Sequence, residues 1–176
     1  MMCCVPITVR SVACRSSSPE ALDSPGGRDN YDVKHLSLAG GGRMAHILIE
    51  YSANLSGRID LPRFLEAVHS AALGTGIFPI GGVRTRAYAA EHYRIADGHP
   101  DNAFVHTMLR VGHGRDVETR KRACEAIFAT ICDQLAGLFE QLPLGLSLEM
   151  QEIDPVLTLK KNNLHEYVKK RTAGQK

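Results

Sequence analysis

The stretch 44-MAHILIEYS-52 decides the fold, because the hydrophobic pattern of the chain changes at its first residue. Residues 47–49 are Ile-Leu-Ile, and the apolar run ends at Ser52. A run of this length, rich in β-branched side chains, is typical of a mostly buried strand. The folded part of the chain is therefore expected to begin at Met44.

The preceding 43 residues differ from the rest in composition. They are rich in serine, glycine and proline, as in Ser16-Ser17-Ser18-Pro19 and Gly40-Gly41-Gly42, and they have no sustained apolar period. Such a segment buries too few side chains to offset the entropy lost on ordering. We expect residues 1–43 to be a disordered extension. The alternative is that translation starts at Met44 and that residues 1–43 are included only because the start was assigned too far upstream. The expected domain spans residues 44–170, and residues 171–176 form a flexible tail.

A helix and a strand follow the first strand. Asp60 can cap a helix whose apolar side chains recur on one face until the glycines at 74 and 76 end it. From Gly81 to Asp97 apolar and polar side chains alternate, as they do in a strand whose two faces meet different environments. Residues 44–97 thus predict strand, helix, strand.

The same order repeats in the second half. Residues 104–111 alternate as a strand, Asp116 opens a long amphipathic helix that ends before Pro143, and residues 144–150 alternate as another strand. A short terminal helix is expected at residues 162–170.

Two β-α-β units predict an α+β fold of order β-α-β-β-α-β. A strand-helix-strand connection packs back on its own sheet, so each unit should contain a parallel strand pair. We expect a four-stranded sheet with two helices on one face. The other face and the edge strands would then need cover, which oligomerisation would supply.

Composition excludes several classes of function. The 176 residues carry a formal charge of +2 and are 44% hydrophobic, so neither nucleic acid nor a membrane is an expected partner. No apolar run approaches the roughly 18 to 20 residues that cross a bilayer. The five cysteines are an odd number without regular spacing, which fits a reducing, cytoplasmic setting better than a disulfide framework.

Two possible cofactor sites are rejected on spacing. His46 and His106 fall in neighbouring predicted strands, but no third ligand lies at a convincing spacing, so packed or hydrogen-bonded histidines are expected and no metal. Gly112-His113-Gly114 begins like a dinucleotide-binding loop, yet the third glycine is absent. No metal or organic cofactor is expected.

An ordered set of short motifs from Met44 to about Lys170 resembles the 5-carboxymethyl-2-hydroxymuconate isomerase family of the tautomerase superfamily. The motifs are Gly76-Ile77-Phe78-Pro79, Gly82-Val83-Arg84-Thr85-Arg86, Ala96-Asp97-Gly98, Ala103-Phe104-Val105-His106, Gly112-His113-Gly114-Arg115 and Asn162-Asn163-Leu164-His165. The resemblance implies a trimer of β-α-β-β-α-β subunits whose sheets face one another around an axis. It also implies a substrate with two or three carboxylates, formed in homoprotocatechuate breakdown.

The resemblance places the catalytic base at the N-terminus, where this chain departs from the family. Members remove the initiator methionine and use an N-terminal proline, whereas Ala45 follows Met44 here. The implied reaction moves a proton from the 2-hydroxyl of a dienol to carbon, and one amine can carry it. Ala45 could serve only as a free amine, because an amide inside the chain has no proton to exchange. The alternative is that Ala45 is simply a strand residue.

Three arginines are candidate ligands for substrate carboxylates. Arg84 and Arg115 match the family motifs, and guanidinium groups bind carboxylates through two parallel hydrogen bonds. Arg115 also precedes the long helix, whose N-terminal dipole favours an anion. Arg86 shares the strand face of Arg84 and is either a second clamp or a surface charge.

Two functions follow. The first is a cofactor-independent enol-keto isomerase acting on 5-carboxymethyl-2-hydroxymuconate or a similar polycarboxylate. The second is a catalytically silent trimer of the same fold that only binds a small anion.

Overall fold

The computed structural model describes residues 44–174 and contains one four-stranded sheet with three α-helices. The expected extension at 1–43, with Cys3, Cys4 and Cys14, lies outside the described residues. β1 (Ala45–Ser52) leads through the short 3-10 helix η2 (Ala53–Leu55) to α1 (Leu61–Gly74), and η3 (Ile80–Gly82) precedes β2 (Val83–Ala90). The second half contains β3 (Ala103–Gly112), α2 (Val117–Phe139), β4 (Leu144–Ile153) and α3 (Leu164–Ala173).

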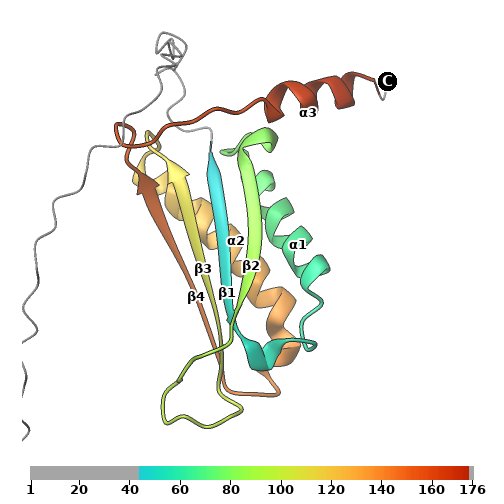
Figure 1. Ribbon diagram of the computed structural model, residues 1–176, viewed down its shortest axis with the longest axis vertical. Coiled ribbons are helices and arrows are strands. Elements are labelled where there is room, and N and C mark those ends of the chain that lie inside the picture. Colours follow the sequence, from blue (N-terminus) through green and yellow to red (C-terminus); the bar gives the residue numbers. More distant parts are fainter. Residues whose placement is uncertain (1–43, 175–176) are drawn as a thin grey trace, which may run out of the picture. The chain divides into compact units, whose positions relative to one another are not determined.

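The strands are ordered β2-β1-β3-β4, and both β-α-β units have the expected parallel pair. β1 and β3 join the two units in antiparallel pairing at the centre of the sheet. As a result, β1 and β2 begin, and β3 and β4 end, at the same end of the sheet. Figure 1 shows α1 and α2 covering one face. This confirms the α+β fold predicted from the sequence.

The predicted helix caps are present. The Asp60 side chain accepts a hydrogen bond from the Arg63 backbone N–H (3.2 Å), and Asp116 accepts one from Thr119 (2.8 Å). These bonds satisfy backbone donors that have no partner within a first helical turn. Gly76 follows α1 with a φ of +73°, a conformation that favours glycine.

The predicted strand at 81–97 is too long. β2 ends at Ala90, and residues 91–102 form a loop held by its own polar groups. The Asn102 amide donates to the carbonyl oxygen of Ile95 (3.1 Å) and to the carboxylate of Asp97 (2.7 Å). Ala96 and Gly98 have positive φ values, which a strand does not accommodate. Local side-chain hydrogen bonds therefore override the alternating pattern.

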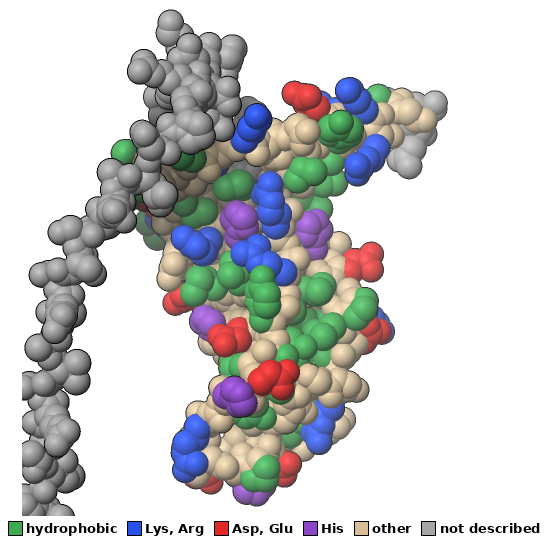
Figure 2. All heavy atoms as spheres, viewed as in Figure 1, with side chains coloured by type: hydrophobic (Ala, Val, Ile, Leu, Met, Phe, Trp, Pro, Cys, Tyr) green, Lys and Arg blue, Asp and Glu red, His purple; other side chains and the backbone are tan. Residues whose placement is uncertain are grey.

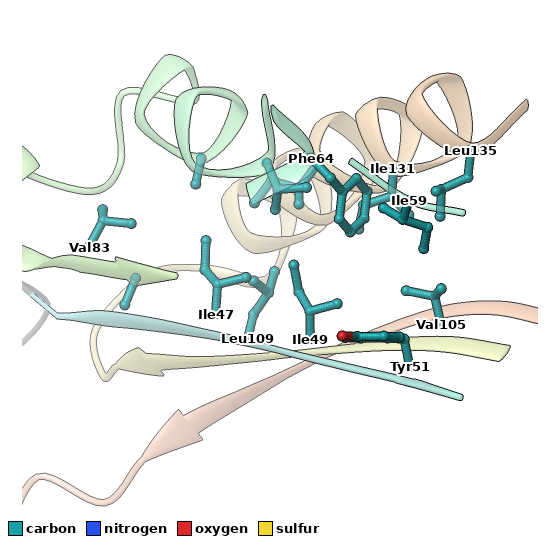
Figure 3. Close-up of a cluster of buried hydrophobic side chains, with 14 of the residues drawn as sticks. Ile47, Ile49, Tyr51, Ile59, Phe64, Val83, Val105, Leu109, Ile131 and Leu135 are labelled. Carbon is teal, nitrogen blue, oxygen red and sulfur yellow. The ribbon is translucent and has the colours of Figure 1, made fainter. Parts of the chain in front are cut away.

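The core lies between the sheet and α1 and α2. Odd-numbered residues of β1 and β3 point into it and meet apolar side chains from the helices (Figure 3). Completely buried members include Ile47, Ile49, Leu109, Ile127 and Ile131. Even-numbered residues of these strands point to the opposite face, called here the open face, which no helix among residues 44–174 covers (Figure 1).

The last helix begins and ends later than predicted. α3 spans residues 164–173 and therefore includes three residues that the sequence assigned to the tail. It contacts η3 beside the start of β2. Among residues 44–174 no helix combines the length and hydropathy required to cross a membrane.

Candidate functional site

Ala45 lies at the end of the sheet where β1 begins. It is 1% exposed, opposite Val83 of β2 on one side and Val111 of β3 on the other. The Met44 carbonyl accepts a hydrogen bond from the Gly112 backbone N–H (3.0 Å), so the pairing of β1 with β3 extends one residue before Ala45. A backbone nitrogen at this point is enclosed by two neighbouring strands.

Arg115 reaches the same end of the sheet from the turn before α2. Its guanidinium donates to the carbonyl oxygens of Ile77 (2.7 Å) and Gly112 (3.0 Å) and lies over the Phe78 ring, 5.0 Å from its centroid. Burial lowers the pKa of Arg115, and the Glu152 carboxylate opposes part of that shift. The side chain is half-buried and oriented, in contrast to an ordinary surface arginine.

Arg84 and Arg86 lie on the open face of β2. Arg84 stands opposite His46, the residue after Ala45, and donates to the Gly82 carbonyl (3.3 Å). Arg86 is one pleat further along and contacts Nδ1 of His46 through Nη1 (3.2 Å). The structure thus gathers Ala45, Arg84 and Arg115 at one end of the sheet, with Arg86 next to them.

The two histidines considered as metal ligands each make a hydrogen bond. His46 contacts Arg86, and Nδ1 of His106 lies 2.8 Å from the Ser147 hydroxyl. Within the described range 44–174 no three His, Cys, Asp or Glu side chains are grouped closely enough to hold a metal ion.

A segment of which the sequence analysis singled out only Asn162 and Asn163 crosses this end of the sheet. Residues 154–163, called here the strap, run from the end of β4 to the start of β2 (Figure 1). Asp154 forms a turn at its beginning by accepting the backbone N–H groups of Val156 (2.7 Å) and Leu157 (3.0 Å). At its end the Asn162 amide donates to the Gly81 carbonyl (3.2 Å). Sequence periodicity could not reveal the anchor of the strap, because Asn162 and Gly81 are 81 positions apart.

Arg110 was also missed. It lies on the open face of β3 opposite His46, so Arg84, His46 and Arg110 form one row across three strands. The alternation within residues 104–111 places Arg110 on a sheet face, but only the register of β3 against β1 places it beside His46.

A second hollow lies elsewhere on the described residues 44–174. A cleft of about 470 Å³ lies between the start of α1 and the second half of α2, where Arg58, Arg63 and Asp133 line it. None of the four candidate site residues contributes to it, so we keep the site at the Ala45 end.

Comparisons with known proteins point to one family. The model of the 5-carboxymethyl-2-hydroxymuconate isomerase family matches residues 45–168. The 5-carboxymethyl-2-hydroxymuconate Delta-isomerase of Escherichia coli is 39% identical over 126 residues, which cover 72% of this chain and 100% of that protein.

Solved structures give the same result. A 5-carboxymethyl-2-hydroxymuconate isomerase from Deinococcus radiodurans R1 is similar with a TM-score of 0.67 and 39% identity, covering 72% of this chain and 95% of that one. A second 5-carboxymethyl-2-hydroxymuconate delta-isomerase has the same TM-score, with 33% identity and coverage of 72% and 93%. Pt0534, solved after inactivation by 2-oxo-3-pentynoate, shares the fold at 17% identity, with a TM-score of 0.50 and coverage of 70% and 98%.

Proposed function

The chain belongs to the 5-carboxymethyl-2-hydroxymuconate isomerase family, and from this membership we propose that it is a cofactor-independent enol-keto isomerase of aromatic-acid breakdown. The proposed substrate is 5-carboxymethyl-2-hydroxymuconate or a similar unsaturated polycarboxylate. One structural observation carries the proposal for this chain: the sheet register brings the start of β1 together with Arg84 and Arg115.

The proposed base is the amine of Ala45. A free N-terminal amine has a reference pKa of about 7.7 to 8, and burial lowers it, so it can accept a proton near neutral pH. The amine would take the proton of the enol hydroxyl while the electrons form the ketone, and it would return that proton to the substrate carbon. The proton is conserved, and no oxidant or reductant is consumed.

The arginines would hold the substrate carboxylates. Arg115 is held by two backbone carbonyls and the Phe78 ring, so little side-chain entropy remains to be lost on binding. Arg84 stands one residue beyond Val83, the strand partner of Ala45. Orientation of this kind converts a bimolecular proton transfer into an effectively intramolecular one.

A second candidate function is anion binding without catalysis. Ala45 is joined to Met44, whose carbonyl is part of the sheet pairing, and a peptide nitrogen cannot act as a base. A chain that keeps this bond would retain the fold and the arginines and lose the proton carrier.

We further propose a homotrimer in the cytoplasm. The open face carries Leu48, Met108 and the exposed Tyr88, which a second copy of the sheet would cover. Cys124 and Cys132 are free thiols, which fits a reducing compartment.

The test starts with the N-terminus. Intact-mass analysis of the natively expressed protein should show a chain beginning at Ala45. In a chain started at Met44, Ala45→Pro should then raise the dienol-to-ketone rate followed by ultraviolet absorbance, because a secondary amine in a ring is held more rigidly. Unprocessed protein, or no rate gain from a folded Ala45→Pro chain, would favour the silent binding protein.

A further inference from the structure

A basic groove lies under the strap at the edge of the open face. It encloses about 390 Å³. Its lining consists of Met44, His46, Arg86, Arg110, Ile153, Leu157, Thr158 and Leu159. Two arginines and a histidine thus share a groove whose lining contains no carboxylate.

The positive charges in this groove are not neutralised by neighbouring acids. Among residues 44–174, neither Arg86 nor Arg110 has a carboxylate within ion-pair distance. Arg84 adds a third guanidinium in the row with His46 and Arg110. Figure 2 shows basic and histidine side chains gathered over this part of the sheet. The local field therefore favours an anion.

His46 lines the groove, and its Nε2 can donate a hydrogen bond. An arginine can only donate, so the contact from Arg86 Nη1 requires Nδ1 of His46 to accept. The neutral ring then carries its proton on Nε2. Burial lowers the pKa of His46, as do Arg86, Arg84, Arg110 and Lys160, and this keeps the ring in the neutral form.

The strap contributes apolar side chains to the lining of the groove. Leu157 and Leu159 line the groove together with Ile153, and the Asp154 turn fixes the chain at this point. Leu157 and Leu159 are 83% and 81% exposed, so this side of the groove is open to water, and anion binding rests on the charge-assisted hydrogen bonds of the guanidinium groups.

We propose that the basic groove binds a small multivalent oxyanion, of the polycarboxylate or phosphate class, through Arg86, Arg110 and Nε2–H of His46. This assigns Arg86 to the groove and adds Arg110 and His46 as ligand-binding residues. Binding does not need a free amine at Ala45, so the groove can be tested independently of isomerase activity.

The test is calorimetric titration of the full chain at constant ionic strength, with inorganic phosphate and with propane-1,2,3-tricarboxylate in separate runs. Arg110→Gln should weaken binding roughly ten- to a hundredfold, the loss expected for a charge-assisted contact. The matched control is Arg122→Gln, which removes the same charge from the exposed side of α2 and should change affinity less than about twofold. Arg110→Lys keeps the charge without the planar fork and should give an intermediate loss.

Each outcome decides between the possibilities. Arg110-dependent binding of the tricarboxylate alone would identify the occupant as a carboxylate compound such as the substrate, and dependence with phosphate would identify a general oxyanion site. Either result supports the groove. No binding of either anion, or equal weakening by Arg122→Gln, would overturn it.

Discussion

Removing either of two buried hydroxyl groups on neighbouring strands should change the free energy of unfolding in opposite directions. Thr107 of β3 and Ser52 of β1 are both 0% exposed. The Ser52 hydroxyl accepts the backbone N–H of Phe104 (3.0 Å), whereas the Thr107 hydroxyl has no hydrogen-bond partner among residues 44–174. A buried hydroxyl without a partner destabilises the native state by about 1–3 kcal/mol.

Thr107→Val replaces this hydroxyl with a methyl group of similar shape. We expect the free energy of unfolding to rise by about 1–2 kcal/mol, because desolvation of the hydroxyl is no longer required. Ser52→Ala should lower it by about 1–2 kcal/mol, because the Phe104 N–H loses its acceptor. For a domain of this size each kcal/mol moves the melting temperature by roughly 3–5 °C.

Thermal and urea unfolding followed by circular dichroism measure both effects. The two variants should shift the melting temperature in opposite directions, with unchanged urea m-values. A Thr107→Val protein that is no more stable than the parent would refute the reasoning, since it would show that the hydroxyl is satisfied in solution.

Two further predictions concern the strap and the basic groove. A Cβ atom at Gly81 would lie 2.7 Å from His165 Nδ1 and 3.0 Å from its Cα, so Gly81→Ala should displace α3 and speed hydrogen exchange at residues 162–174. Gly74→Ala, whose Cβ meets nothing within 4 Å, is the control. The pKa of His46 is lower in the folded protein than in the unfolded chain, so the unfolded chain takes up a proton at a higher pH. The free energy of unfolding should therefore fall as the pH drops below about 6.5. His46→Gln should remove that part of the pH dependence, measured by urea unfolding between pH 7.5 and 5.

Clear results would contradict either prediction. Unchanged exchange at residues 162–174 in Gly81→Ala would show that the position of α3 does not depend on its close contact with Gly81. An identical pH profile in His46→Gln would show that His46 is not the titrating group. Asp97 and Asp116 do not interfere, because hydrogen bonds lower their pKa values and their contribution is lost only below about pH 4.

Local sequence rules predicted the elements because each signal lies within a few residues. Asp60 and Asp116 cap the helices as expected, an apolar run identified β1, and alternation identified β3 and β4. The same rules extended β2 into residues 91–97, where Asn102 and a positive φ at Ala96 form a loop. The alternation of apolar and polar residues does not reveal hydrogen bonds from side chains outside the strand, so it could not predict where β2 ends.

The candidate site was predictable only in part. Motif resemblance identified Ala45, Arg84 and Arg115, and the structure places them at one end of the sheet. Their roles in catalysis stay predictions. Arg110 and the strap were missed because their positions depend on pairing of β3 with β1 and on the contact of Asn162 with Gly81. Such long-range contacts have no signature in a single sequence.

The strap also has a consequence for the order of folding. Its anchor joins Asn162 to Gly81 across 81 positions, so closing this loop costs more chain entropy than forming the contacts within either β-α-β unit. We therefore expect it to assemble after the rate-limiting step, and changes in it to alter the unfolding rate more than the refolding rate. The strap residues that line the basic groove would then be the last part of the domain to fold and the first to unfold.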